Sequence, residues 1–213
     1  MTRRGLALVS VALGLCADLQ AAELTIHMTN RAGAPLVDAV VFDSGAKAAP
    51  RASGAGRATI VQHNRVFEPF VTVVQTGTSI SFPNDDPMMH HVYSFSPAKR
   101  FEIKLYKGTP AGPVVFDKAG VVALGCNVHD WMLAYVLVVD APVFAKSGHD
   151  GALRLAGLGA GTHRLMAWYP GMRDPVALPE ITLAAGEVRT IEHRLEVPVR
   201  TRPKAPPFDA KQY

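Results

Sequence analysis

Cysteine is scarce in this sequence, which has two among 213 residues. A small fold held together by several disulfides is therefore excluded. Charged residues make up 19% and aromatic residues 8% of the chain, and they do not gather into the basic, aromatic-interleaved surface of a nucleic-acid binder. Apolar residues are plentiful, at 48%. At this length they suffice for the core of one large domain or two small ones.

Long apolar runs are also missing, except near the N-terminus, where residues 6–15 form a run too short to span a bilayer. Arg3 and Arg4 precede this run, and Ala21 and Ala22 follow it. This is the layout of a secretory signal peptide. We therefore predict that residues 1–22 are a cleaved signal peptide. The mature protein is expected to be periplasmic or secreted, without a membrane span.

Sustained helical periodicity is absent between residues 23 and 140, which predicts an all-β sandwich or barrel. Strands are expected at residues 23–29, 36–43, 58–62, two meeting at Gly77 within 70–82, 90–95, 99–106, 120–126 and 132–140. Residues 144–197 alternate apolar and polar side chains, which predicts a second, small β-sandwich. The Pro-rich residues 198–213 are predicted to form a disordered tail.

Removal of the signal peptide would leave Cys126 as the only cysteine, in a compartment where thiols tend to pair. In the stretch GCNVHDWM, His129 and Met132 follow it at intervals of three residues. Sulfur ligands favour copper, and two His, one Cys and a weakly bound Met form an electron-transfer copper site. The stretch NDDPMMHHVYSF offers the second histidine, as His90 or His91.

These motifs resemble the cupredoxins, the small copper β-sandwich proteins that include plastocyanin and amicyanin. The Cys-x2-His-x2-Met spacing is similar to that of amicyanin, and the resemblance covers roughly residues 58–140. The upstream positions that carry it are Phe67, Pro69, Gly77, Asn84, His90 and Val92. The resemblance implies a Greek-key cupredoxin sandwich at residues 58–141. The amino-acid sequences of both ligand stretches also resemble those of exported bacterial proteins labelled as methylamine-utilisation proteins.

The resemblance implies a single mononuclear type 1 copper whose ligands are His90, Cys126, His129 and Met132. Asn84 and His91 are implied as supporting residues around these ligands, and His91 stands where the family often has an Asn that ties the two ligand loops. Val128 stands where many members have Pro. The implied role is a one-electron carrier, not an enzyme, that serves an unidentified redox partner in the cell envelope. The exposed edge of His129 would be the exit for the electron.

Several assignments stay open on the sequence alone. The ligand is His90 in the register set by Val92, but the neighbouring His91 is the alternative. If Met132 were core filler, the axial ligand would come from Met88 or Met89. Trp131 either covers the site from solvent or packs in the core.

The outer segments resemble a carboxypeptidase-regulatory-like β-sandwich. Residues 144–197 are similar to its later strands, and RAGAPLVDAVVF is similar to its opening strands. One prediction is therefore a single sandwich, formed by residues 23–57 and 144–197, with the copper domain inserted in its middle. The alternative gives residues 23–57 to the copper domain.

Two other functions compete with electron transfer. The same ligands could serve a copper carrier or storage protein without redox turnover. The chain could also be an envelope module that recognises carbohydrate or protein, because the outer sandwich type often has such a role. Reversible reduction of bound copper would distinguish an electron carrier from both.

Overall fold

The computed structural model describes residues 21–46, 54 and 56–207, and within them every regular element is a strand. The predicted all-β fold is confirmed. None of these residues belongs to a helix that could cross a bilayer. Most of the predicted signal peptide (residues 1–20) and the end of the predicted tail (208–213) lie outside the described residues.

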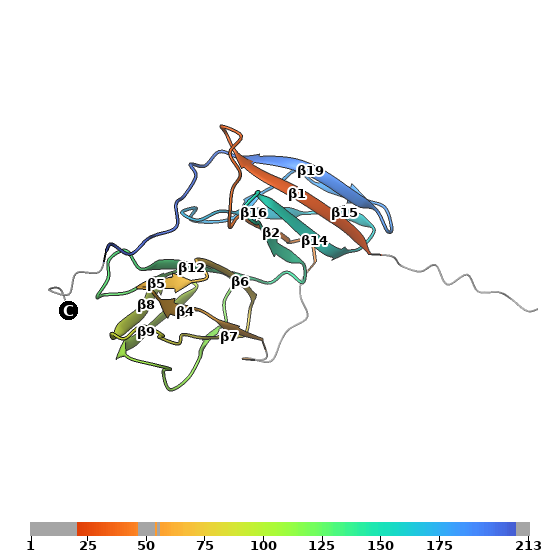
Figure 1. Ribbon diagram of the computed structural model, residues 1–213. Coiled ribbons are helices and arrows are strands. Elements are labelled where there is room, and N and C mark those ends of the chain that lie inside the picture. Colours follow the sequence, from red (N-terminus) through yellow and green to blue (C-terminus); the bar gives the residue numbers. More distant parts are fainter. Residues whose placement is uncertain (1–20, 47–53, 55, 208–213) are drawn as a thin grey trace, which may run out of the picture.

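The chain forms two β units (Figure 1). The outer unit contains β1 (Ala22–Asn30), β2 (Val40–Asp43), β13 (Phe144–Lys146), β14 (Ala152–Leu158), β15 (Gly161–His163), β16 (Leu165–Trp168), β17 (Val176–Ala177), β18 (Ile181–Leu183) and β19 (Val188–Leu195). The inner unit contains β3 (Arg57–Thr59), β4 (Val61–His63), β5 (Val66–Glu68), β6 (Val71–Gln75), β7 (Thr78–Ser81), β8 (His90–Ser96), β9 (Lys99–Tyr106), β10 (Val114–Phe116), β11 (Gly120–Gly125) and β12 (Leu133–Val139).

The outer unit is assembled from both ends of the described chain. Strand β1 pairs antiparallel with β14 and parallel with β19, so the first strand lies between two late ones. Strand β2 likewise pairs antiparallel with β13 and β16. Alternate residues of β1 (Leu24, Ile26 and Met28) are fully buried in the core of this unit. The alternation is the period of two that a half-buried strand requires.

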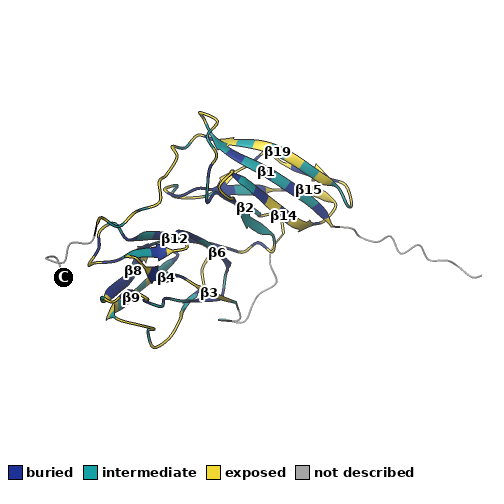
Figure 2. Ribbon diagram, in the orientation of Figure 1, coloured by how far each residue is buried: buried dark blue, intermediate teal, exposed yellow. Residues whose placement is uncertain are grey.

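The inner unit pairs a five-stranded sheet, in the order β6-β12-β11-β8-β9, with a three-stranded sheet, β10-β7-β3. Side chains from both sheets share one core, and buried residues concentrate in strands such as β8 and β12 (Figure 2). Gly77, with φ of 88°, turns the chain between β6 and β7, as the sequence predicted. Cys126 and Met132, which flank the loop between β11 and β12, belong to this core.

One predicted strand is shorter than expected. Residues 36–43 read as one strand, but β2 begins only at Val40. Asp38 adopts φ of 66°, the left-handed conformation, which interrupts a strand. The amide of Leu36 donates instead to the carbonyl of Met28. The buried Asp38 carboxylate contacts Lys146, whose Nζ lies 3.1 Å from Oδ1.

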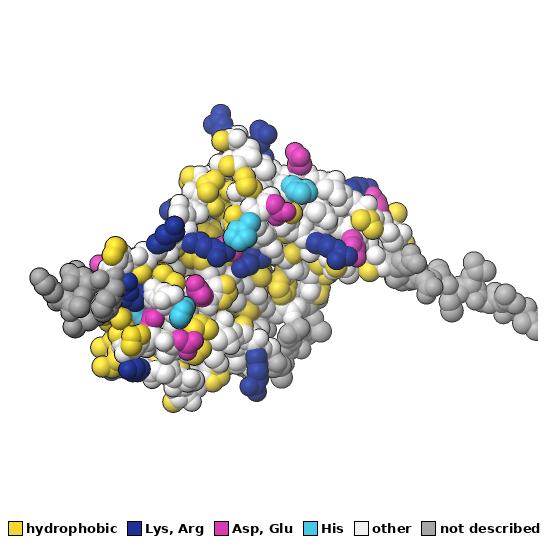
Figure 3. Space-filling view, viewed as in Figure 1, with side chains coloured by type: hydrophobic (Ala, Val, Ile, Leu, Met, Phe, Trp, Pro, Cys, Tyr) yellow, Lys and Arg dark blue, Asp and Glu magenta, His cyan; other side chains and the backbone are white. Residues whose placement is uncertain are grey.

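Residues 198–207 contain no strand and run from the outer unit across to the inner one (Figure 1). Arg202 donates to the Asp38 carboxylate over 2.9 Å, and Arg65 of the inner unit donates to the carbonyl of Pro206 over 2.7 Å. On the face shown in Figure 3, Lys and Arg side chains lie in a row between the two units. This segment therefore ties the two units together through polar contacts.

A third apolar cluster lies at the junction of the units. Trp168 of the outer unit is fully buried there beside Phe70 and Leu137 of the inner unit. Its ring meets that of Tyr135 edge-on with centroids 5.5 Å apart, and its Nε1 donates to the carbonyl of Met172. The indole thus packs against inner-unit residues while its only polar atom is satisfied.

Trp168→Ala is expected to lower the free energy of unfolding by about 3–5 kcal/mol, because it leaves a cavity that neighbouring strands cannot fill. Chemical denaturation followed by fluorescence or circular dichroism measures the loss. Phe95→Ala is the matched control, since Phe95 is 75% exposed and its loss should change stability by no more than about 0.5 kcal/mol. Equal losses in the two variants would contradict a packed junction.

Candidate metal centre

His90 opens β8 and is the first component of the candidate site. The pairing of β8 with β9 shifts register between His90 and Val92, and the extra residue lies in β9, which bulges opposite His91. A bulge redirects side chains at the end of a strand. His90 is fully buried, and its Nδ1 faces the loop that follows β11.

Cys126 and His129 come from that loop. It is closed by the pairing of Gly125 with Leu133, which joins β11 to β12 in an antiparallel pair. Within the loop the amide of Met132 donates to the carbonyl of His129 over 2.9 Å, which forms a tight turn. Cys126 is 3% exposed. Because the loop is short and both of its ends are paired strands of the core, the side chains of Cys126 and His129 are held at the edge of that core.

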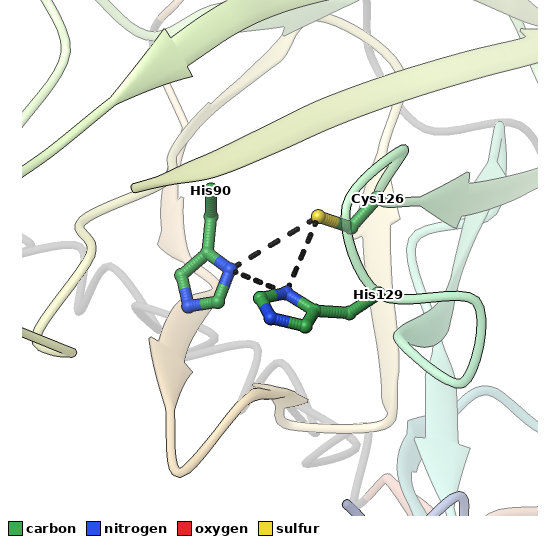
Figure 4. A group of neighbouring side chains, drawn as sticks. All are labelled: His90, Cys126 and His129. Atoms are coloured by element: carbon green, nitrogen blue, oxygen red, sulfur yellow. Dashed lines mark hydrogen bonds between the residues drawn. The ribbon is translucent and has the colours of Figure 1, made fainter. Parts of the chain in front are cut away.

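The three side chains form a compact triangle (Figure 4). Nδ1 of His90 lies 3.1 Å from Nδ1 of His129, and the Cys126 sulfur lies 4.0 Å and 3.9 Å from these nitrogens. Metal bonds of about 2.0 Å to nitrogen and about 2.3 Å to sulfur are typical of such donors. Every separation is shorter than the sum of the two bonds concerned, so one ion can bond all three atoms.

The donor set fits a soft transition metal. One sulfur and two imidazole nitrogens suit copper, whereas a magnesium or calcium site would present oxygen donors. Among the described residues, this is the cluster of His, Cys and acidic side chains with donor atoms close enough for one metal ion. All three residues are buried, so the donors are already withdrawn from water.

Met132 lies beside the triangle in the chain and in the core. It is 2% exposed and belongs to the same apolar cluster as Cys126. Met89, one of the alternatives considered for the axial position, is 55% exposed. A thioether that bound the same ion would have to lie beside Cys126 at the edge of this core, which favours Met132 over the exposed Met89.

The surroundings hold the Cys126 thiol toward its ionised form. Burial raises the pKa of this thiol, but the hydrogen bond with His90 and the backbone amides of His91, Val128 and His129 outweigh that effect. The net pKa is below the usual value for cysteine. The thiolate is the form that binds metals.

The two histidines are shifted in opposite directions. Burial lowers the pKa of His90, but its contacts with Cys126 and Asp86 raise it above the usual value overall. Burial also lowers the pKa of His129, and the positive charges of His90 and Arg65 lower it further. His129 is therefore held toward the neutral imidazole that binds a metal.

His129 is only 1% exposed, so the prediction that its edge reaches solvent is wrong. The Trp131 ring covers it, with centroids 5.1 Å apart, and the Arg65 guanidinium lies 5.9 Å from the centre of the Trp131 ring. Trp131 Nε1 donates to the carbonyl of Arg65 over 2.9 Å. Arg65 also contacts Pro206, so this cover extends into the C-terminal segment.

The two predicted supporting residues lie near the triangle but contact other groups. His91 is buried, and its Nε2 pairs with Glu102 of β9 at 2.8 Å, whereas we expected a bond to the Cys126 loop. The backbone amide of His91, not its ring, faces the Cys126 sulfur. Asn84 binds the carbonyls of Met88 and Tyr106, which fixes the turn before β8.

Sequence reasoning missed Asp86. Its carboxylate lies 2.8 Å from Nε2 of His90, on the side of the ring away from Cys126. Burial raises the pKa of Asp86, but bonds from the amides of Arg65 and Asn64 and from His90 bring it below the usual value. The only sequence signal was an acidic residue four positions before a candidate ligand, beside the equally acidic Asp85.

The sequence matches no protein-family model and no curated protein. Part of the chain is similar to solved structures. A purple cupredoxin from Nitrosopumilus maritimus is 23% identical, with a TM-score of 0.35, over 38% of this chain and 99% of that one. The reduced Cu(I) form of a single-residue mutant of amicyanin is 21% identical, with a TM-score of 0.36, over 43% of this chain and 92% of that one. A copper-containing nitrite reductase from Thermus scotoductus is 19% identical, with a TM-score of 0.37, over 53% of this chain and 28% of that one.

Proposed function

We propose that this chain is an exported mononuclear copper protein that carries single electrons between redox partners in the cell envelope. The observation that carries the proposal is the buried triangle of His90, Cys126 and His129, whose donor atoms lie 3.1–4.0 Å apart. Met132 is the proposed weak axial ligand. The predicted signal peptide and the resemblance to methylamine-utilisation proteins support the exported setting.

Copper supplies one-electron chemistry when it is bound, and the protein's own residues make that chemistry easy to repeat. A thiolate and two imidazoles suit both oxidation states of the metal. The donors already converge, and the turn at residues 129–132 and the pairing of Gly125 with Leu133 hold them in place. Because the ligands need to move little when the charge changes, each electron is transferred at a low structural cost.

Copper storage is the second candidate, and the burial of His129 favours it. A carrier usually presents a ligand edge to its partner, whereas here Trp131 covers that edge. Voltammetry of the copper-loaded protein separates the two functions. A reversible one-electron wave is expected for the carrier. Bound copper that resists reduction or leaves the protein on reduction would overturn electron transfer and favour storage.

Met132→Leu is expected to keep copper bound but to raise its reduction potential, because a weak electron donor that stabilises the more positive ion is lost. Leucine retains a similar apolar volume in this buried position, so the packing cost should stay below about 1.5 kcal/mol. Voltammetry and denaturation measure the two effects. Met89→Leu is the matched control at an exposed methionine. An unchanged potential in Met132→Leu would place the axial ligand elsewhere.

A further inference from the structure

We propose that Asp86 is a positioning residue of the metal centre: its carboxylate orients His90, anchors the turn that holds Trp131 against His129, and lowers the reduction potential of the bound copper. The inference deepens the proposed function and rests on it. Its starting point is an acidic side chain in direct contact with a ligand of the triangle, at a site closed to solvent. The side-chain exposures are 7% for Asp86 and 0% for His90.

The first step concerns the orientation of the His90 ring. Asp86 Oδ2 lies 2.8 Å from Nε2 of His90, while Nδ1 of the same ring faces Cys126 and His129. An ionised carboxylate accepts hydrogen bonds and cannot donate one. The proton of a neutral His90 therefore belongs on Nε2, and the lone pair of Nδ1 points into the triangle. Carboxylates commonly orient metal-binding histidines in this way.

The second step concerns how firmly Asp86 itself is held. Its Oδ1 accepts from the amide of Asn64 at 2.7 Å, and its Oδ2 accepts from the amide of Arg65 at 2.8 Å. Its own amide donates to Oδ1 of Asn84 at 3.0 Å. With both oxygens and the backbone engaged, the carboxylate cannot turn away without breaking several hydrogen bonds.

The third step concerns the turn that Asp86 binds. Asn64 and Arg65 join β4 to β5 with φ of 52° and 58°, a two-residue hairpin turn in which both positions are left-handed. An arginine is an unfavourable choice there, and the Asp86 carboxylate offsets this cost by accepting both amides. The carbonyl of Arg65 then accepts from Trp131, whose ring covers His129. One carboxylate thus supports two of the ligands.

The last step concerns charge. A buried negative charge next to a ligand stabilises the more positively charged state of the metal more than the less charged state. Asp86 should therefore favour Cu(II) over Cu(I) and lower the reduction potential. It should also make His90 a stronger donor, because an imidazole that donates to a carboxylate is more basic at its other nitrogen.

The test compares Asp86→Asn with Asp85→Asn, an exposed neighbour that loses the same charge. Copper affinity of Asp86→Asn should fall about 10–100-fold, as is typical when such a supporting residue is lost, and its reduction potential should rise. Asp85→Asn should leave both close to those of the unmutated protein. If both variants show the same charge-transfer spectrum and the same copper reduction potential, the inference is overturned.

A nuclear magnetic resonance experiment on the diamagnetic Zn(II)- and Cu(I)-loaded proteins gives a readout independent of electron transfer. The Nε2 proton of His90 should exchange slowly with water in the unmutated protein and rapidly in Asp86→Asn. If Asp86→Asn fails to fold, Asp86→Glu keeps the charge but moves the oxygens, so its affinity should fall while its potential stays low. If the Nε2 proton exchanges slowly but the bound copper cannot be reversibly reduced, only the proposed function is overturned. If the Nε2 proton exchanges rapidly in the unmutated protein, the role of Asp86 is overturned.

Discussion

Cys126→Ser is expected to abolish the intense visible absorption of the Cu(II)-loaded protein. That absorption would arise from charge transfer between the Cys126 thiolate and copper, and a serine hydroxyl offers no comparable donor. Cys126 is 3% exposed at the end of the inner core, and serine keeps the shape of a small side chain. The chain should therefore remain folded while the band disappears completely, which absorption and circular dichroism spectra of the same samples would show.

Zinc provides a control for this variant, because Zn(II) binds thiolate and imidazole but has no such visible band. Unmutated protein loaded with zinc should be colourless and that loaded with copper strongly coloured. A pale Cu(II) spectrum in the unmutated protein would contradict a type 1 copper site. A coloured Cys126→Ser variant would show that the sulfur ligand is another residue.

His90→Ala should have the second largest effect, because it removes a ligand from the triangle. The charge-transfer band should change strongly, and added imidazole should restore part of it by occupying the vacated position. Among the described residues, no other His, Cys or acidic side chain forms a metal-sized group with Cys126 and His129, so none can replace His90. Titration with copper and imidazole, followed by absorption, measures both effects.

His91→Ala is the matched comparison, since it removes the same ring one residue further along β8. Its ring pairs with Glu102 and with no ligand of the triangle, so its loss should leave the band in place and weaken copper binding far less than the loss of His90. Glu102→Gln should produce a smaller loss of the same kind. An intact band in His90→Ala together with a lost band in His91→Ala would move the ligand by one residue.

The local parts of the site were predictable from the sequence. Cys126, His129 and Met132 are close in the chain, and apolar strands on both sides force them into one short loop, which the pairing of Gly125 with Leu133 closes. The strands predicted here from the alternation of apolar and polar residues agree with β8, β9, β11 and β12 to within one residue, whereas β10 (Val114–Phe116) was not predicted. A strand that buries one face has apolar residues at every second position, and this alternation can be seen directly in the sequence.

The partners of the ligands were not predictable. The sequence offered His90 and His91 as neighbours with similar chemistry, and it offered Asp85 and Asp86 in the same way. In the structure His90 faces Cys126 at the point where β8 and β9 shift register, and the β4–β5 turn brings two amides to Asp86. Which of two neighbouring residues faces the site depends on the pairing register of strands that are far apart in the chain.

Three features follow from the amino-acid sequence alone: the all-β class, the spacing of Cys126, His129 and Met132, and the region that supplies the second histidine. Each of these is set by local periodicity or by a few consecutive residues. Three others arise only from the folded arrangement: β1 lies between β14 and β19, His129 is buried beside Trp131, and Asp86 holds His90. These features depend on how separate strands and loops pack together, and composition and spacing do not specify which of several similar side chains will meet.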